Sequence, residues 1–567
     1  MTASLGDQRK GIFWFLITSV LVTLAFRWPT MFHETGIDSF FVHTLANSAA
    51  EFGEIRWVVN PLSVFGLYPM SYASGMPILL AEFSNMSGFA MEQCFLVFSC
   101  IVAIISALTA FLLGMEIKNS PLFAFAVSVL YSASPLLLVW TEWTITTRYL
   151  FMALLPLTLW ILLRLNRIEQ KTSNVLDKRG MVALLLVNLF LLALIHNLFM
   201  MTILFILVFF VSKRVYKILS RPKSAIVMRR KGMPLQRVVT MSAVVFVIGF
   251  VAVVSYSLGW MGLESYESGV FQGNSDLTRF LNLLSSISAT IGYPIAFLLP
   301  ISLLITLKSR KRGFIGIFFL ISFLFILPFS GGRTYERLLY PIVLGILILL
   351  PYQMLVLKKH QRIYIKAVAV ALALTLPMNL LLVDHYNRWS ETQAAVSDGP
   401  STPDHTYMTA QFYSYYLGGE PFAVNNWLVG GQIQAYSNSP LSLWNDGILL
   451  IYGIIEPDSI DAKLNSIDEF FSSGGEIFST DWMETLYHDY AFLFLYRSDP
   501  IDGKDIIDRY DIGNFIEDTR LNGKTMGYNM AILYPSGNNS APFIVGMHQT
   551  TYKIYDNGID IIWRIRT

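Results

Sequence analysis

The sequence predicts a polytopic α-helical membrane domain of about 11 spans, followed by an external α/β domain. The chain of 567 residues is 54% hydrophobic and only 14% charged, whereas a soluble globular chain carries nearer ~25% charged residues. Long apolar runs recur through residues 1–383, which hold 31 Lys and Arg against 15 Asp and Glu. Residues 384–567 hold 10 against 24. We therefore expect a basic transmembrane domain over 1–383 and a separate acidic domain over 384–567.

Nine apolar runs are each suited to one membrane crossing, which takes about 20 residues. They lie at 11–29, 92–114, 121–140, 149–165, 239–260, 286–307, 314–330, 338–357 and 363–383. A further run, 181–212, is too long for one ordinary span and is interrupted by His196-Asn197. We expect two short helices with a tight turn there. A single strongly tilted helix is the alternative, and it would invert every later loop.

Basic residues favour the double crossing, because cytoplasmic loops of membrane proteins are enriched in Lys and Arg. With eleven spans, the cytoplasmic segments 164–180, 213–237, 308–312 and 358–362 hold five, nine, four and three Lys and Arg. The external segments of this arrangement hold only Arg27, Arg56, Arg148, Arg279, Arg333 and Arg337. The amino terminus is thus expected in the cytoplasm and the acidic domain outside, at the cell surface or in a lumen.

The first external loop, 30–91, is too long for a plain connector, since ordered connections are usually under ~12–15 residues. Its Pro and Gly residues indicate a segment folded back along the membrane surface. Within it we expect a helix from Asp38 to Gly53, because a short acidic side chain caps free N–H groups and Gly tolerates a left-handed C-terminal turn. Asp38 is then either a helix cap alone or a functional carboxylate at the membrane surface.

The acidic domain shows alternating strand and helix patterns. Strands are expected at 423–426, 476–479 and 491–496, and strand-like runs end the chain at 528–534, 542–546 and 559–565. Apolar residues at helical spacing predict a helix over 458–473. The pattern favours an α/β domain finished by antiparallel strands.

Several function classes lack support in the sequence. There is no G-x-x-x-x-G-K-[ST] phosphate loop, G-x-S-x-G turn or H-E-x-x-H helix. The basic cluster Arg221–Arg237 lies beside a membrane span and indicates topology and anionic-lipid contact rather than nucleic-acid binding. A divalent metal such as Mg or Mn near Asp38, Glu142 or Asp276 is left open, because no ligand spacing requires one.

The candidate functional residues are polar side chains on the external loops and at the external ends of the spans, because charges at span ends are costly unless they are paired or functional. They are Asp38, His43, Glu142, Arg148, Asp276, Arg333, Arg337 and Tyr340. Structural roles are alternatives for some of them. Glu142 and Arg148 can pair with each other, and Arg333 and Arg337 can anchor their helix at the lipid headgroups.

Three motifs, taken in order, resemble the GT-C superfamily of membrane glycosyltransferases. Asp38-Ser-Phe-Phe-Val-His43 resembles the family's first-loop motif of an acidic residue followed by aromatics. Tyr68-Pro-Met-Ser-Tyr-Ala-Ser-Gly-Met-Pro77 is similar to the Tyr-Pro…Pro-Gly-x-Pro turn of dolichyl-phosphate-mannose-dependent members. Arg337-Leu-Leu-Tyr-Pro341 resembles their late Arg-Tyr-x-x-Pro motif, with the Tyr displaced. The resemblance covers roughly the first 350 residues.

The resemblance implies sugar transfer from a polyprenyl-phosphate donor to a glycan or protein acceptor. Asp38 would be the base that takes a proton from the acceptor hydroxyl, and one base on one face implies inversion at the anomeric carbon. Arg337, with Arg333, would hold the donor phosphate, since Arg matches phosphate geometry. The other candidate substrate-binding residues are Tyr340, His43, Glu142, Arg148 and Asp276. The donor's lipid chain would lie in a groove between spans, among membrane lipids.

Two alternatives remain open. Asn426-Trp-Leu-Val-Gly-Gly-Gln-Ile433 is faintly similar to the Trp-Trp-Asp-Tyr-Gly motif of oligosaccharyltransferase catalytic subunits, which transfer a glycan to protein Asn, although the second Trp and the Asp are missing. From another class, a transporter or receptor with an external ligand-binding domain would share the topology. A transporter should carry polar residues in mid-span, whereas the charges here gather at one surface.

Overall fold

The computed structural model describes most of the first 219 residues and parts of the remainder. The described residues are 5–29, 31–67, 71–138, 141–170, 175–219, 291–292, 294–296, 298–299, 314–326, 333–356, 370–381, 402–424, 427–439, 513–518 and 551–565. Several predictions lie outside them: the span at 239–260, most of that at 286–307, Asp276, the helix at 458–473, and the strands at 476–479, 491–496, 528–534 and 542–546.

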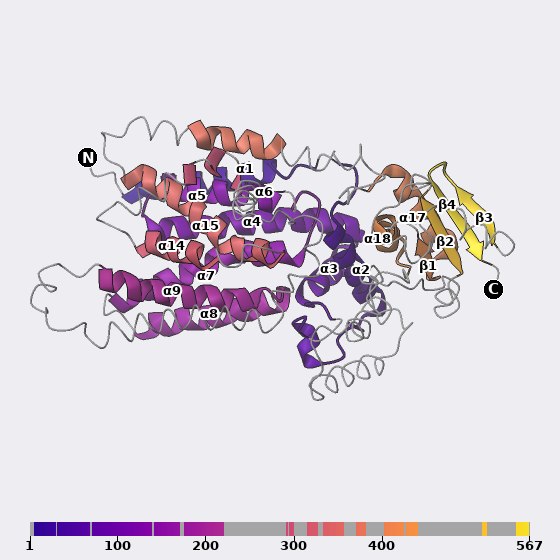
Figure 1. Ribbon diagram of the computed structural model, residues 1–567, viewed down its shortest axis with the longest axis horizontal. Helices are drawn as coiled ribbons and strands as arrows, with labels where there is room; N and C mark the ends of the chain where they lie inside the picture. Colours follow the sequence, from indigo (N-terminus) through magenta and orange to yellow (C-terminus); the bar gives the residue numbers. More distant parts are fainter. Residues whose placement is uncertain are drawn as a thin grey trace, which may run out of the picture.

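A bundle of apolar helices forms the body of the molecule (Figure 1). Its elements are α1 (Leu5–Ala25), α4 (Met91–Ile117), α5 (Pro121–Ser132), α7 (Thr147–Gln170), α8 (Val175–Ile195), α9 (Phe199–Leu219), α14 (Phe314–Ile326), α15 (Arg333–Val356) and a helix over Val370–Leu381. Among the described residues, α4, α7 and α8 each contain a stretch long and apolar enough to cross a membrane. These helices identify an integral membrane protein.

The long apolar run at 181–212 is two helices, as predicted. α8 ends at Ile195 and α9 begins at Phe199. His196 stabilises the break, because its Nδ1 accepts a hydrogen bond from the Leu198 N–H at 3.0 Å. The expectation of short helices was wrong: each has 21 residues, because both continue into the neighbouring basic segments.

The run at 121–140 is interrupted, which the sequence analysis did not predict. α5 ends at Ser132 and the short α6 occupies Pro135–Leu138. Pro135 lacks an N–H and clashes with the preceding turn, so it begins a new helix instead of extending the old one. The break exposes main-chain carbonyls, and the Ser132 carbonyl accepts a hydrogen bond from Arg27 Nη2 at 2.8 Å.

One continuous apolar core joins the bundle helices and extends into the first loop. Its buried members include Val42 of the loop, Phe95 of α4, Tyr131 of α5, Phe151 of α7 and Leu344 of α15. Because the same core contains residues of the loop and of the bundle, the loop is packed onto the helix ends rather than suspended from them.

The first loop folds into three short helices with a small core of their own. They are α2 (Ile37–Phe52), η1 (Pro61–Val64) and α3 (Gly75–Ser87). Leu45 of α2 and Trp57 are buried together, and Trp57 Nε1 donates to Ser74 Oγ, just before α3, at 3.1 Å. At Gly75 an added Cβ would lie 2.8 Å from the Leu194 carbonyl oxygen, so glycine permits α3 to contact the end of α8.

The described part of residues 402–565 contains two helices and a four-stranded sheet. The helices are α17 (Asp404–Leu417) and α18 (Trp427–Ser437); the strands are β1 (Phe422–Val424), β2 (Asn514–Asp518), β3 (Thr551–Asp556) and β4 (Asp560–Ile565). The sheet order is β1-β2-β4-β3, with β1 parallel to β2 and the other pairs antiparallel. Tyr413, Phe422, Ile433, Ile516 and Ile562 form its core. β1 and β4 overlap two of the predicted strands.

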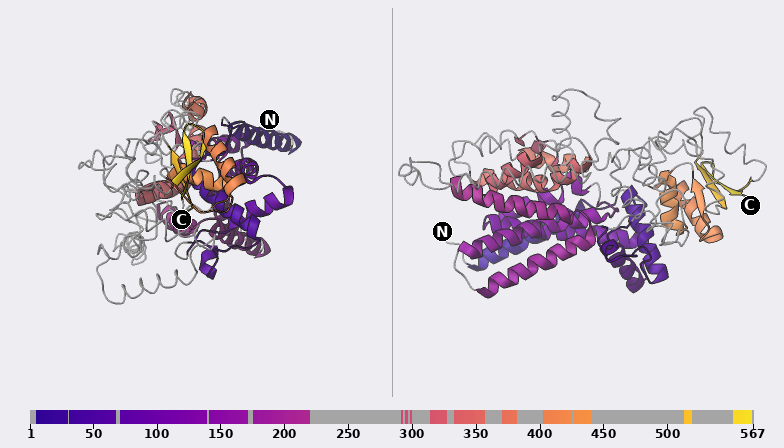
Figure 2. Two further views of the ribbon diagram at one scale, coloured as in Figure 1. Left: turned by 90° about the vertical axis from the view of Figure 1, so that its right-hand side faces the viewer. Right: turned by 60° about the horizontal axis from the view of Figure 1, so that its bottom comes forward.

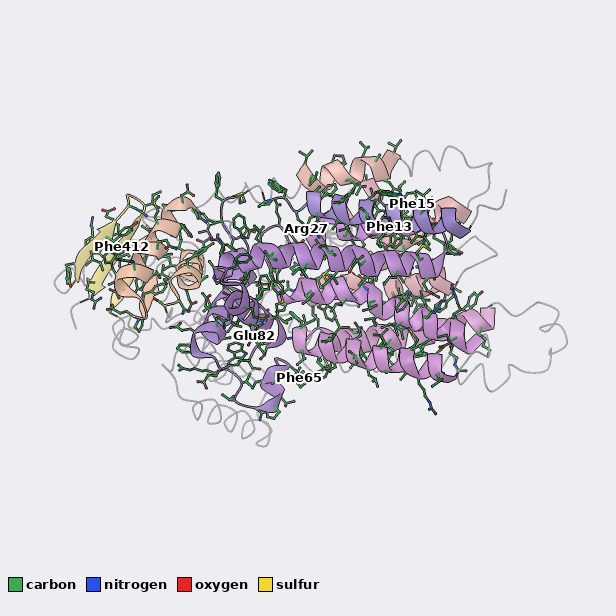
Figure 3. All side chains as sticks on the ribbon, turned by 180° about the vertical axis from the view of Figure 1, so that it is seen from behind. Phe13, Phe15, Arg27, Phe65, Glu82 and Phe412 are labelled. Atoms are coloured by element: carbon green, nitrogen blue, oxygen red, sulfur yellow. The ribbon has the colours of Figure 1, made fainter. Side chains whose placement is uncertain are left out.

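The C-terminal region lies at the end of the bundle that carries the first loop. Figure 1 and the right-hand view of Figure 2 place α2 and α3 between the bundle and this region, with the amino terminus at the opposite end. Figure 3 shows the same order through Phe13 on α1, Arg27, Glu82 on α3 and Phe412 on α17. α18 contacts α2 directly: Asn47 Nδ2 donates to the Ala435 carbonyl at 2.8 Å.

Candidate functional site

The start of α2 is held against the segment before α7 by a glycine. Gly36 is the N-cap of α2, with a φ of 93°, and an added Cβ would overlap Thr144 Oγ1. Only glycine combines this φ with so close an approach. Asp38 therefore lies inside the first helical turn and not at the N-cap, so its interpretation as the N-terminal cap was wrong. The predicted C-terminus is confirmed: Gly53 takes the left-handed conformation, with a φ of 65°.

Asp38 forms an ion pair with Arg148 in the first turn of α7. Arg148 Nη2 lies 3.4 Å from Asp38 Oδ2, and the two side chains are 21% and 44% exposed. The pair is thus half accessible, at the point where two helices begin. Asp38, Tyr72 and Tyr340 lie close enough to the guanidinium to interact with it electrostatically. Next to Arg148, Thr147 Oγ1 is hydrogen-bonded to the Tyr72 hydroxyl at 2.9 Å.

The helix α15 reaches the same corner of the molecule at Tyr340. Tyr340 is 3% exposed and close to Arg148. Arg337 lies one helical turn before Tyr340 in α15, and Arg333 is the first residue of the helix. The fold thus brings the first turns of α2 and α7 and Tyr340 of α15, which are far apart in the sequence, to one place. The Asp38 carboxylate and the Arg148 guanidinium meet there.

Glu142 and Arg27 lie beneath this corner. Glu142 is 4% exposed, and its main-chain carbonyl accepts a hydrogen bond from Thr35 Oγ1 at 3.2 Å. Its charge acts on Arg27, which is fully buried and donates to Thr141 Oγ1 at 2.8 Å. Arg148 pairs with Asp38, so the sequence-based alternative that paired Arg148 with Glu142 is not needed to satisfy that arginine.

His43 lies on a different face of α2 from Asp38. It is buried, with Nδ1 2.5 Å from Glu34 Oε2, and its ring stacks on Phe95 with 5.1 Å between centroids. Glu34 is fully buried and also accepts a hydrogen bond from Ser39 Oγ at 2.6 Å. The sequence analysis proposed His43 as a substrate ligand and did not propose Glu34. The sequence signal that could have indicated Glu34 is that it lies four residues before Asp38.

A second acidic residue, Glu92 at the start of α4, joins the first loop to the C-terminal region. Its Oε1 accepts hydrogen bonds from the Glu34 N–H at 3.1 Å and from the Tyr436 hydroxyl at 3.2 Å, and lies 3.2 Å from His33 Nδ1. Burial raises the pKa of Tyr436 well above its ordinary value, and the charges of Glu34 and Glu92 add to the effect. Tyr436 is thus a neutral hydrogen-bond donor in this junction.

Within the part of the chain that the structure describes, no group of three or more His, Cys, Asp and Glu side chains could hold a metal ion. Asp38 is occupied by Arg148, and Asp276 lies outside the described residues. The site defined by the described residues is therefore the Asp38–Arg148 ion pair, beside Tyr72 and Tyr340, at the end of the bundle that carries the first loop.

The described residues combine a bundle of apolar helices, a folded first loop and a C-terminal region that contacts this loop. The structure is similar to the apo form of the Archaeoglobus fulgidus oligosaccharyltransferase, with a TM-score of 0.55, 12% identity, and coverage of 97% of this chain and 74% of that chain. The same enzyme, tethered to an acceptor peptide containing the NVT sequon through a disulfide bond, gives the same TM-score over 98% of this chain.

ArnT from Cupriavidus metallidurans in the apo state matches with a TM-score of 0.49 and 13% identity, over 98% of this chain and 97% of that chain. No protein-family model matches the sequence, and no curated protein matches it either. The resemblance to the GT-C superfamily that the motifs indicated is confirmed at the level of the fold.

Proposed function

We propose that the protein is an inverting glycosyltransferase that moves a sugar from a polyprenyl-phosphate donor to an acceptor hydroxyl at the external membrane face. The observation that carries the proposal is the Asp38–Arg148 pair, placed in the first turns of α2 and α7 and close to Tyr340 of α15, in a chain with the GT-C fold. The Asp38 carboxylate is half exposed and lies at the end of the bundle that carries the first loop. At this position it is accessible both to a lipid-linked donor and to an acceptor from the aqueous side.

In the proposed reaction, Asp38 takes the proton of the acceptor hydroxyl as that oxygen attacks the anomeric carbon. The new bond joins the acceptor oxygen to the anomeric carbon, and the bond from that carbon to the phosphate oxygen breaks. The polyprenyl phosphate leaves as an anion, so no strong general acid is required. Because attack comes from the face opposite the phosphate, the anomeric configuration inverts. General-base catalysis of this kind typically contributes ~100–10,000-fold.

Arginines are proposed to orient the carboxylate base and to bind the negatively charged donor phosphate. Arg148 fixes the orientation of the Asp38 carboxylate, and Arg337, with Arg333, binds the donor phosphate in the bidentate manner that the guanidinium allows. Tyr340 lies between these two functions, one turn after Arg337 and beside Arg148. His43 and Glu142 support the site from the buried side.

The direct test is transfer by membranes that contain the protein, given radiolabelled polyprenyl-phosphate sugars and endogenous acceptors. We expect Asp38→Asn to lower the rate by at least ~100-fold, because the amide cannot accept the proton. Glu54→Gln is the matched control: Glu54 lies on the same loop, is 66% exposed and pairs with Arg56. Undiminished transfer by Asp38→Asn would remove Asp38 from the mechanism.

Oligosaccharyltransferase-like transfer of a glycan to protein Asn is the second candidate, and the structural similarity to the A. fulgidus enzyme favours it. The two candidates differ in their products. A glycolipid product is extracted into organic solvent, and an O-linked protein product releases its sugar by alkaline β-elimination. A label that stays on protein through both treatments and is released by an amidase would identify the Asn acceptor.

The external location is tested with a reporter fused to the C-terminus. We expect the reporter on the external side, because the C-terminal region contacts the first loop and lies at the opposite end of the bundle from the amino terminus. Cytoplasmic reporter signal would contradict the proposed side of action and the arrangement of the spans.

A further inference from the structure

The fully buried carboxylate of Glu34 is satisfied on both of its oxygens. Oε1 accepts a hydrogen bond from Ser39 Oγ at 2.6 Å, and Oε2 lies 2.5 Å from His43 Nδ1. A buried carboxylate is costly unless such partners are supplied. Both partners are on α2, four residues apart, so they lie on one face of the helix. Glu34 therefore holds one face of α2, and Asp38 lies outside that face.

Ser39 passes this contact on to the segment before α7. While its hydroxyl donates to Glu34, its oxygen accepts the main-chain N–H of Ile145 at 3.1 Å. Ser39 directly follows Asp38, and Ile145 precedes Arg148 by three residues. One hydroxyl thus connects the two chain segments that carry Asp38 and Arg148. A serine hydroxyl, with one donor and two acceptor sites, can make both bonds at once.

The main chain of Glu34 and its neighbour adds further attachment points. The Glu34 N–H donates to Glu92 Oε1 at 3.1 Å, and its carbonyl accepts from Thr402 Oγ1 at 3.2 Å. The Thr35 N–H donates to the Trp143 carbonyl at 3.0 Å. The segment around Glu34 is therefore fixed to α4, to the start of the C-terminal region and to the segment that leads into α7.

We infer that Glu34 is a positioning residue, which sets Asp38 against Arg148 through Ser39 and the Ile145 main chain. Asp38 itself is half exposed, and among the described residues Arg148 is its one ion-pair partner, so its position depends on the main chain of α2. The expected effect of Glu34 on the transfer rate rests on the proposed glycosyl transfer, whereas its expected effect on the distance between positions 38 and 148 does not. The distance and the rate are therefore measured in separate experiments.

Proximity is measured by cross-linking, which needs no activity. In a background with Cys94→Ala and Cys100→Ala, the pair Asp38→Cys and Arg148→Cys is treated in membranes with a short bifunctional thiosulfonate. Because both charges of the ion pair are gone, the surrounding contacts alone hold the two positions together. We expect Glu34→Ala and Ser39→Ala to slow cross-linking several-fold, whereas Glu34→Gln retains it, since the amide can accept from Ser39 and donate to His43. Glu54→Ala, on the same loop, is the control and should have no effect.

Activity is measured in the chain that retains Asp38 and Arg148. We expect Glu34→Ala to lower kcat about 100-fold, the scale of a ~1 Å misplacement of a reacting group, with the donor KM unchanged. Glu34→Gln should restore most of the rate. Ser39→Ala, which removes one hydroxyl only, tests the same link in a variant that disturbs folding less.

Each outcome has a distinct meaning. Cross-linking that is equally fast with Glu34→Ala or Ser39→Ala overturns the positioning role. Slower cross-linking in a protein whose wild-type form transfers no sugar leaves the positioning role standing and removes the proposed function. A fall in kcat that Glu34→Gln does not restore, with cross-linking intact, also overturns positioning, because the carboxylate would then act by its charge.

Discussion

Arg148 and Asp38 form an ion pair across the starts of two helices, with 3.4 Å between Nη2 and Oδ2. The arginine is the more buried partner, and it also lies close to Tyr72 and Tyr340. The guanidinium is thus held by its surroundings, and the carboxylate is oriented by the guanidinium. A base that must meet a reacting hydroxyl requires such orientation.

Replacing Arg148 should therefore impair catalysis more than binding. We expect Arg148→Ala to lower the initial rate at saturating donor by ~10-fold or more, because Asp38 loses its orienting partner. Arg148→Lys should be intermediate, since an ammonium keeps the charge but not the planar fork. Arg56→Ala serves as the control, because Arg56 has an exposed pair with Glu54 on the same loop. A wild-type rate in Arg148→Ala would separate this pair from the chemistry.

Arg337→Ala should act chiefly on the donor. Loss of a charge-assisted contact with a phosphate is expected to raise the donor KM by ~10-fold or more, the equivalent of 1.5–3 kcal/mol, with a smaller change in kcat. The measurement is a donor titration at fixed acceptor. Arg164→Ala is a matched control, because Arg164 pairs with Glu116 where α7 and α4 end, far from Tyr340. Equal donor KM values for wild type and Arg337→Ala would exclude the phosphate role.

Gly36→Ala should destabilise the start of α2. The φ of 93° and the overlap with Thr144 Oγ1 together predict a loss of about 1–3 kcal/mol and a lower midpoint of thermal unfolding in detergent. Gly53→Ala should cost less, because its added Cβ meets nothing within 4 Å. Gly36→Ala combined with Thr144→Ala should recover part of the loss. If Gly36→Ala and Gly53→Ala unfold at the same temperature, the close contact with Thr144 is not important for stability.

The junction at Tyr436 predicts a dependence on alkaline pH. Its pKa is raised, first by burial and then by Glu34 and Glu92, so the folded form keeps the phenol neutral at a pH where the unfolded chain ionises it. The stabilising hydrogen bond to Glu92 is fully effective below the ordinary tyrosine pKa of ~10. Above that pH the unfolded chain loses the phenol proton while the folded protein keeps it, so the stability that Tyr436 contributes falls as pH rises. In Tyr436→Phe this pH dependence is absent.

We therefore expect wild type to unfold at a higher temperature than Tyr436→Phe at about pH 8, with the gap narrowing towards about pH 11. Tyr415→Phe provides the control for general tyrosine ionisation, because Tyr415 is 82% exposed. A gap that is constant across this range would mean that Tyr436 titrates equally in the folded and unfolded states.

Local sequence patterns correctly predicted those helices and helix ends that depend only on residues close together in the sequence. The two helices around His196 and the left-handed end of α2 at Gly53 follow from apolar length and from glycine's conformational freedom. The break at Pro135 was missed, although proline is a strong local signal, because the apolar length around it fits one span. The cap of α2 was misplaced by two residues: Asp38 is a good capping side chain, but the contact with Thr144 requires Gly36 at that position.

The sequence alone determined that the chain is an integral membrane protein with many apolar helices, and it predicted Asp38 on the first loop and Arg148 and Arg337 near the starts of apolar runs, because apolar runs and their charged ends are local properties. Tertiary structure alone decided that Asp38 meets Arg148, that His43 faces Glu34 instead of Asp38, and that Glu92 joins Tyr436 of the C-terminal region. Such pairings depend on how helices from separate parts of the chain pack. The free energy that selects them comes from burying the whole apolar core, which no window of the sequence contains.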